Sequence, residues 1–152
     1  MSQVIATNKK AHRDYFLTDK WEAGIALHGA EVKSIRDGGV SFKDSFARIE
    51  KGEMYLHSLH INPYANAGHF TEEPDRCRKL LLHKKEIRKI EALVSQKNLT
   101  LIPTRLYFNA RGLVKVEIAL GKGKKQYDKR DAIKKRKVDM DIKRAMRQGQ
   151  KR

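Results

Sequence analysis

The residues best suited to chemistry lie in one basic segment, residues 121–130, which reads GKGKKQYDKR. Its glycines and its Lys and Arg side chains can follow a phosphate backbone, and Tyr127 adds a ring that can stack on a base. The alternative is a solvated basic linker without a dedicated partner. Tyr127 argues against it, because no other aromatic residue occurs in residues 121–152. The segment therefore predicts contact with nucleic acid.

The histidines and the single cysteine do not have the spacing of a metal site. Only His57 and His60 are close in sequence, and on one strand their odd separation places them on opposite faces. Neither HExxH nor CxxC occurs. We expect no metal site, and we expect Cys77 to be an unreactive thiol because no activating group is recognisable around it.

The carboxylates likewise give no sign of catalysis. No spacing rule brings together any two of the candidates Asp14, Glu22, Glu31, Asp44 and Glu117. The GxSxG motif of esterases and the GxxxxGK[ST] phosphate loop are also missing from the sequence. We expect neither an enzyme nor a cofactor.

Composition points to the same class of partner. The chain has 152 residues, enough for one core, and its 34 Lys and Arg against 18 Asp and Glu leave a formal charge of +16. Such an excess favours polyanions through Coulomb attraction and counterion release. No apolar run approaches the roughly 20 residues that a membrane-spanning helix needs. The first ten residues do not resemble a leader sequence. A single cysteine cannot form an internal disulfide. We expect a cytoplasmic protein that binds nucleic acid and no membrane.

The charge is unevenly distributed, which predicts a domain boundary. Residues 1–120 contain 20 basic and 14 acidic residues, whereas residues 121–152 contain 14 basic and 4 acidic residues. Only the first part shows regular apolar patterning. We therefore expect a folded domain over residues 1–120, with a flexible segment at residues 1–10, followed by a basic tail over residues 121–152.

The tail has a thin apolar stripe at Val138, Ile142, Ala145 and Met146, with helical spacing. This stripe is too small to offset an ordering cost of about 1 to 2 kcal/mol per residue. The tail is therefore predicted to be disordered when free and helical against a partner. A calmodulin-like or membrane-surface target is the competing use, which Asp139 and Asp141 disfavour.

Periodicity in the first part predicts short strands and two or three helices. Residues 21–27 alternate as a half-buried strand, residues 29–36 have helical spacing, and residues 40–50 and 53–61 form an antiparallel pair around Lys51-Gly52. Residues 62–75 contain two prolines and a glycine and predict a loop.

The pattern continues with one more helix and two more strands. Residues 80–94 predict an amphipathic helix with a basic outer face, and residues 99–109 and 113–120 predict two strands. Short strands at hairpin spacing favour a small antiparallel barrel of the OB type, because closure removes exposed sheet edges. The expected fold class is mainly β.

Several motifs together resemble one known family. They are NKKA at residues 8–11, EAGI at 22–25, EVKSIR at 31–36 after Gly29, DSF at 44–46, RKLLLH at 78–83 and the basic segment at 121–130. In these motifs the chain is similar to the SsrA-binding protein family, also called SmpB, from about residue 8 to residue 147.

The resemblance implies an OB-type barrel that binds the tRNA-like domain of transfer-messenger RNA and enters stalled ribosomes with it, in ribosome rescue and peptide tagging. The shared RNA would also bring elongation factor Tu. By resemblance, the RNA-contact residues are Asn8, Lys9, Lys10, Glu22, Leu81, His83 and Lys115. Glu22 and Lys115 also fall on the outer faces of their expected strands, whereas a Leu in a three-Leu run is ordinarily core.

By the same resemblance, the tail would occupy the decoding centre of the small ribosomal subunit and the empty message channel. Tyr127 would stack on a ribosomal base, and Met146 would help to seat the induced helix. The cations that would neutralise ribosomal RNA are Lys124, Lys125, Lys129, Arg130, Lys134, Lys143 and Arg144. Two alternatives remain: a ribosomal or translation-factor OB protein that binds ribosomal RNA, and an RNA-processing enzyme.

Overall fold

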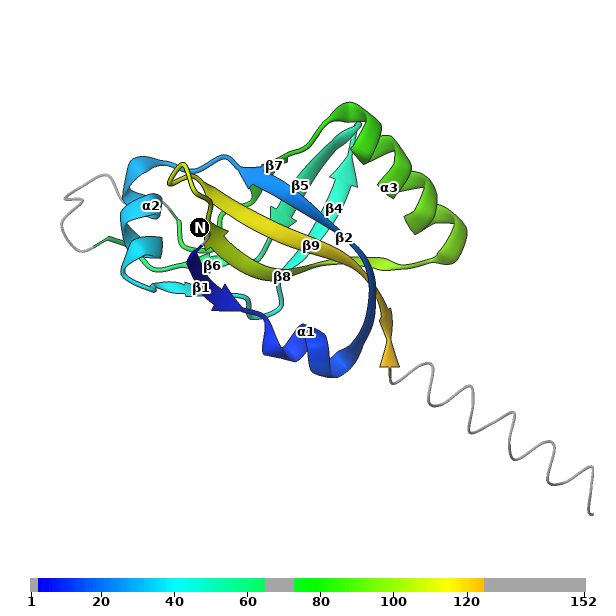
Figure 1. Cartoon of the computed structure of the whole chain (residues 1–152), viewed down its shortest axis with the longest axis horizontal. Coiled ribbons are helices and arrows are strands. Elements are labelled where there is room, and N and C mark those ends of the chain that lie inside the picture. Colours follow the sequence, from blue (N-terminus) through cyan, green and yellow to red (C-terminus); the bar gives the residue numbers. More distant parts are fainter. Residues whose placement is uncertain (1–2, 65–72, 125–152) are drawn as a thin grey trace, which may run out of the picture.

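A ring of antiparallel strands forms the body of the molecule (Figure 1). The computed structural model describes residues 3–64 and 73–124. In chain order the described elements are β1 (Gln3–Thr7), α1 (Lys9–Asp14), β2 (Tyr15–Ile25), α2 (Gly29–Arg36), β3 (Val40–Ser41), β4 (Phe46–Glu50), β5 (Glu53–His57), β6 (His60–Ile61), β7 (Arg78–Leu81), α3 (Lys84–Lys97), β8 (Thr100–Phe108) and β9 (Val114–Gly123).

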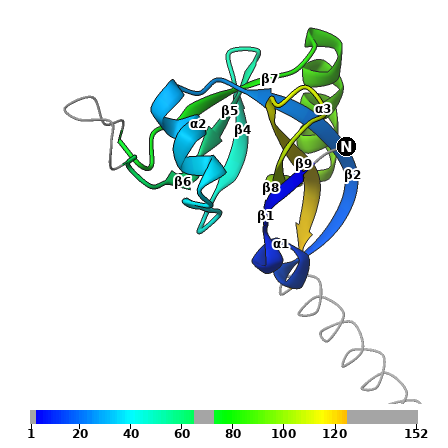
Figure 2. The same ribbon diagram turned by 60° about the vertical axis from the view of Figure 1, so that its left-hand side comes forward.

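The ring runs β8-β4-β5-β7-β2-β9 and closes where β9 pairs with β8. Strand β1 pairs with β8 beside β4, while β3 and β6 form a separate two-stranded sheet. Figure 2 shows α2 and α3 at opposite ends of the ring, and Ile35 of α2 and Ile90 of α3 are both fully buried in the core. The predicted small antiparallel barrel, mainly β with three helices, is confirmed.

The side chains of β2 alternate between the core and the solvent as the sequence predicted. Ala23 and Ile25 are buried, Trp21 is half-buried and Glu22 is exposed. The strand begins earlier than its pattern suggested, at Tyr15, because Tyr15 pairs with Gly123 in an extension of β9. An irregularity in the register between residues 17 and 20 disrupts the alternation there.

The predicted hairpin around Lys51-Gly52 is present. Both residues have positive φ, 51° and 77°, as a tight two-residue turn requires, and Glu50 pairs with Glu53 across it. Helix α2 also matches its prediction, and Glu31 helps to start it by accepting a hydrogen bond from the His28 backbone N–H at 3.0 Å.

The prediction of a helix over residues 80–94 is wrong for its first residues. Leu80 and Leu81 belong to strand β7, and α3 begins only at Lys84. The apolar run looked helical, but Leu80 pairs with both Met54 and Ile25 and so fills a place in the ring. Tertiary pairing overrides local propensity here.

The amino-terminal segment, predicted to be flexible over residues 1–10, is instead paired from Gln3. Strand β1 pairs with β8, with Gln3 opposite Phe108. Asn8 then begins α1 by accepting from the Ala11 N–H at 3.1 Å, and its amide donates to the Pro103 carbonyl at 2.8 Å. Part of the edge of β8 is not covered by β4, so β1 finds its hydrogen-bonding partners there.

The other end of the domain also differs from the expected boundary at residue 120. Strand β9 continues to Gly123, and Gly121 is buried against Ile102 and Tyr15. The barrel therefore extends three residues into the segment that the charge distribution placed in the tail. The predicted behaviour of the tail beyond residue 124 falls outside the described residues.

Candidate nucleic-acid interface

Four neighbouring strands place Leu81, Gly24, Lys115 and Tyr107 in one row across the outer surface of the ring. Gly24 of β2 pairs with Leu81 of β7 on one side and with Lys115 of β9 on the other, and Lys115 pairs with Tyr107 of β8. Directly paired residues point to the same face of a sheet. We call Leu81, Gly24 and Lys115 the outer row.

The outer row combines an apolar group, bare backbone and a cation. Leu81 is 52% exposed, a high value for a leucine in a strand. A Cβ added at Gly24 would lie 3.2 Å from Leu81 Cβ, so the leucine leans over the glycine. Lys115 is half-buried on the other side. This arrangement leaves a surface that can accept a sugar or base beside a charge that can neutralise a phosphate.

A second row runs parallel to the first. Glu22 pairs with Glu117, and Glu117 pairs with Arg105. Two carboxylates directly opposite each other are destabilising unless they are compensated. Arg105 compensates Glu117, with Nε 3.4 Å from Oε2, and the Thr104 hydroxyl donates to the same oxygen at 2.5 Å. Glu22 therefore remains as the carboxylate of this row that faces solvent.

Tyr107 connects the two rows. Its hydroxyl donates to Glu22 Oε2 across strand β9, and the Arg105 guanidinium lies 5.2 Å from the centre of its ring. Burial, together with the hydrogen bond and negative charge of Glu22, raises the pKa of Tyr107 above its ordinary value. The phenol therefore stays protonated at neutral pH and remains a donor to Glu22.

The other residues predicted to contact RNA lie around this face. His83 is exposed and directly precedes α3, two residues after Leu81. Helix α1 begins at the far edge of the second row, because Thr7 pairs with Arg105. At about 4.8 Å per strand, three strand spacings separate Thr7 from Glu22 by about 14 Å.

The residues at the start of α1 differ in what they can do. Lys9 and Lys10 are exposed, and Lys10 forms an ion pair with Asp44 at 3.4 Å. Asn8 is buried, and its side-chain amide bonds to the Pro103 carbonyl and the Ala11 N–H inside the protein. The structure thus brings Glu22, Leu81 and Lys115 together and puts Asn8 in a structural position.

Of the residues predicted to contact the ribosome, only Lys124 falls in the described part of the chain. Its Nζ lies 3.4 Å from the His12 carbonyl oxygen and 5.2 Å from the centre of the Phe16 ring, so its side chain rests on the barrel. Lys125, Tyr127, Lys129, Arg130, Lys134, Lys143, Arg144 and Met146 lie outside the described residues.

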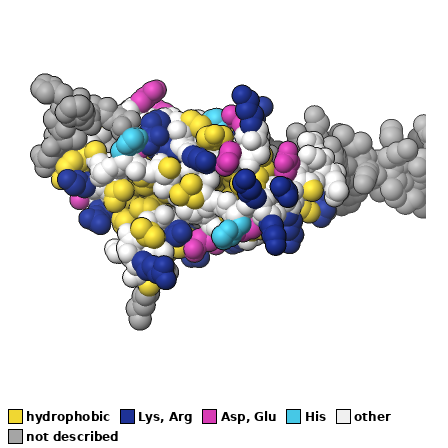
Figure 3. Space-filling model, turned by 90° about the horizontal axis from the view of Figure 1, so that it is seen from above, with side chains coloured by type: hydrophobic (Ala, Val, Ile, Leu, Met, Phe, Trp, Pro, Cys, Tyr) yellow, Lys and Arg dark blue, Asp and Glu magenta, His cyan; other side chains and the backbone are white. Residues whose placement is uncertain are grey.

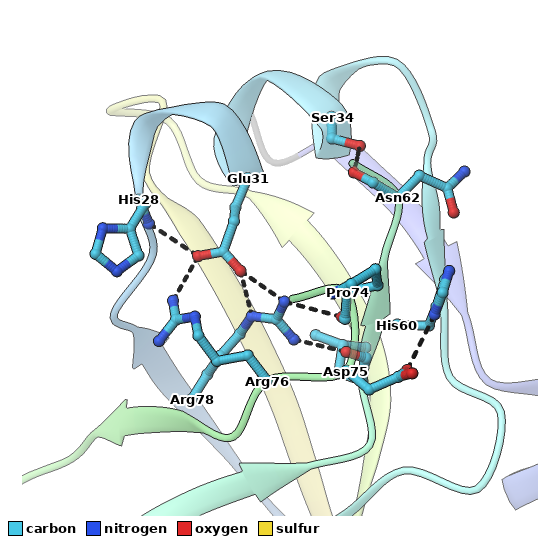
Figure 4. A network of polar contacts seen from close by, with 10 residues as sticks. His28, Glu31, Ser34, His60, Asn62, Pro74, Asp75, Arg76 and Arg78 are labelled. Atoms are coloured by element: carbon cyan, nitrogen blue, oxygen red, sulfur yellow. Dashed lines mark hydrogen bonds and ion pairs between the residues drawn. The ribbon is translucent and has the colours of Figure 1, made fainter. Parts of the chain in front are cut away.

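A buried charge cluster elsewhere is structural (Figure 4). Arg78 is fully buried, and its Nε donates to Glu31 Oε2 at 2.6 Å, while Arg76 donates to Oε1 at 2.5 Å. Burial alone would raise the pKa of Glu31, but the hydrogen bonds from Arg76, the His28 backbone and Arg78 outweigh it and lower the pKa. Glu31, a candidate acid or base from the sequence, joins α2 to β7 in the structure.

Cys77 lies close to a histidine but lacks an activating environment. Its Sγ is 3.9 Å from His57 Nε2, and burial and the charge of Glu50 raise the pKa of the thiol, which keeps it protonated.

Among residues 3–64 and 73–124, no group of three or more potential metal ligands occurs. No helix in the described part of the chain is long and apolar enough to cross a membrane.

The fold and this face define a class: a small basic β-barrel with an outer sheet surface suited to bind folded nucleic acid. Comparison with known proteins gives the family. The model of a family described as SmpB protein matches residues 5–148. The chain therefore belongs to the SmpB protein family.

Relatives match over nearly their whole length. The SsrA-binding protein of Thermosipho africanus (strain TCF52B) is 55% identical over 140 residues, covering 92% of this chain and 94% of the relative. That of Geobacillus kaustophilus (strain HTA426) is 50% identical over 149 residues, covering 98% and 96%. A solved chain described as "tmRNA-SmpB: a journey to the center of the bacterial ribosome" is 50% identical, with a TM-score of 0.67, and the match covers 78% of this chain and 83% of that chain.

Proposed function

We propose that this chain binds transfer-messenger RNA and acts with it in trans-translation on stalled ribosomes, as a binding protein without catalysis of its own. Membership of the SmpB family supports this function. The outer row, with Glu22 beside it, is the structural observation that carries the proposal. A permanent binder of ribosomal RNA, the alternative considered from sequence, is not favoured by the relatives, which are SsrA-binding proteins.

The chemistry of the outer row suits a folded RNA. Lys115 neutralises a backbone phosphate, and Leu81 packs on a sugar or an unstacked base beside the bare backbone of Gly24. The Glu22 carboxylate accepts hydrogen bonds from base amino groups and repels phosphates, so it selects how the RNA is oriented. The tRNA-like domain of transfer-messenger RNA is the part that these residues would contact, with Lys9, Lys10 and His83 at the margins of the surface.

The tail is assigned a separate task. With 14 basic residues in residues 121–152, it would neutralise ribosomal RNA in the decoding centre and the empty message channel. Tyr127 would stack there on a base, and the tail would become helical on binding. Elongation factor Tu would join through the shared RNA, and the protein would work in the cytoplasm.

Affinity for the isolated tRNA-like domain tests the proposal. Lys115→Ala should weaken binding about tenfold, because a charge-assisted contact is worth about 1.4 kcal/mol or more. Arg111→Ala, which removes an exposed cation in the β8–β9 turn, serves as the control and should leave affinity within about twofold of wild type. The melting temperatures of both variants should equal that of wild type, since neither side chain is in the core.

The RNA that copurifies from cells separates the proposal from its alternatives. One discrete species with a tRNA-like end supports it, whereas fragments of ribosomal RNA would favour a ribosomal protein. Turnover of RNA by the purified chain would contradict the assignment as a binding protein.

A further inference from the structure

The exposed side of α3 carries a concentrated positive charge that the outer row does not include. Lys84, Lys85, Arg88 and Lys89 are all exposed, whereas Ile87 and Ile90 on the opposite side of the helix are buried in the barrel. We call these four cations the α3 basic face. Figure 3, which views the molecule from above, shows Lys and Arg side chains gathered in the half where Figure 1 places α3.

Within the described residues, the α3 basic face has no acidic partner. None of its four side chains forms an ion pair with another residue in the described ranges. Lys84 with Arg88, and Lys85 with Lys89, are like charges four residues apart, and each such pair destabilises a helix by about 0.2 to 0.5 kcal/mol. Lys84 and Lys85 in the first turn also oppose the helix dipole, whereas Glu86 in the same turn favours it. An anion bound across the face would relieve the repulsion between these like charges.

The α3 basic face is continuous with the outer row. Helix α3 begins three residues after Leu81, with His83 between them. Strand β7 is antiparallel to β2, and Leu81 pairs with Gly24. The residues that follow Leu81 therefore run beside β2 in the direction of Glu22. An RNA backbone that reaches Lys115 and Leu81 can thus continue onto the start of α3.

We propose that the α3 basic face binds the phosphate backbone of the same folded RNA that contacts the outer row. This inference rests on the proposed function and adds a contact that is independent of base identity. A lipid surface is disfavoured, because the apolar side of α3 is already buried and Ala92 is the only apolar residue on its outer side. Four cations within six residues of one helix are suited to the closely spaced phosphates of an RNA backbone.

The salt dependence of binding to the isolated tRNA-like domain tests the inference. We expect the quadruple variant K84Q/K85Q/R88Q/K89Q to reduce the slope of log affinity against log salt by about 3, since each lost phosphate contact contributes about 0.7 to 0.9. At low salt, affinity should fall by about tenfold or more. Because Gln has a good helix propensity, the melting temperature of the quadruple variant should not fall. The double variant R88Q/K89Q is milder and should show about half the change in slope.

The control is K33Q/R111Q, which removes two exposed cations from α2 and the β8–β9 turn, on the side of the ring away from α3 (Figure 1). If it changes the slope as much as R88Q/K89Q does, the effect is one of net charge and the inference is overturned. An unchanged slope in the quadruple variant overturns it as well, even if tagging on ribosomes is lost, because the contact would then be with ribosomal RNA. If Lys115→Ala weakens binding and the α3 variants do not, the inference fails while the proposed function stands; if none of them weakens binding, the proposed function fails too.

Discussion

The Tyr107 hydroxyl donates a hydrogen bond to Glu22 Oε2, and the exposed Glu22 carboxylate has no other hydrogen bond or ion pair among the described residues. A carboxylate on a free glutamate side chain samples several rotamers, and ordering it on binding costs free energy. Tyr107 is itself buried, and the Arg105 guanidinium lies 5.2 Å from the centre of its ring, so it is a rigid support. We therefore propose that Tyr107 is a positioning residue, which would act on RNA through Glu22.

Tyr107→Phe should weaken binding of the tRNA-like domain by about fivefold, the equivalent of one hydrogen bond of about 1 kcal/mol. In a Glu22→Ala background the same change should have almost no effect, because the group that Tyr107 positions is gone. A double-mutant cycle of dissociation constants measures this coupling. Additive losses would show that Tyr107 and Glu22 act independently of each other.

At the scale of elements, Glu31 and Arg78 join α2 to the strand that carries Leu81. Arg78 has its guanidinium fully used inside the protein, by Glu31, the Leu59 carbonyl at 2.6 Å and the Pro74 carbonyl at 3.0 Å. A buried charge that loses its partner costs far more than an exposed one. We therefore expect the position of β7, and with it the exposure of Leu81, to depend on this pair.

Glu31→Ala should therefore lower the free energy of unfolding by about 3 to 5 kcal/mol, because it leaves Arg78 buried and unpaired. Chemical denaturation at neutral pH measures the loss. Glu53→Ala, which breaks the exposed ion pair with Lys79 at 3.5 Å, is a matched control and should cost less than about 1 kcal/mol. Equal effects of the two substitutions would contradict the structural role of Glu31.

The pair also predicts how stability depends on pH. The pKa of Glu31 is lowered in the folded state, so its contribution is complete above 4.5, the ordinary value, and is lost as pH falls through the folded-state pKa. Wild type should lose stability over this acid range more steeply than Glu31→Gln, whose side chain does not titrate. Parallel curves for the two proteins would show that Glu31 does not contribute to acid sensitivity.

At the scale of the whole molecule, we propose that the barrel and the basic segment after it bind different partners. Deletion from Lys129 onward should leave affinity for the tRNA-like domain within about threefold of wild type at about 0.2 M salt, where non-specific attraction is weak. The same deletion should abolish peptide tagging on stalled ribosomes. Filter binding and a tagging assay measure the two activities, and equal loss of both would contradict the division of labour.

The amino-acid sequence by itself determined the features that depend on neighbours along the chain. Alternation predicted the buried faces of β2 and β9, Lys51-Gly52 predicted a tight hairpin, and helical spacing predicted α2 at its observed bounds. The outward positions of Glu22 and Lys115 followed from the same alternation. Each of these features is set by local geometry: a period of two, a period of 3.6, or a turn that needs positive φ.

Only the tertiary structure decided the features that depend on distant partners. Leu80 and Leu81 are a strand because β5 and β2 lie on either side, and residues 3–7 are a strand because β8 has an open edge. The contacts from Tyr107 to Glu22 and from Arg78 to Glu31 join residues 85 and 47 positions apart. Local pattern specifies which face of an element is buried but not which element covers it, and ring closure selects that partner.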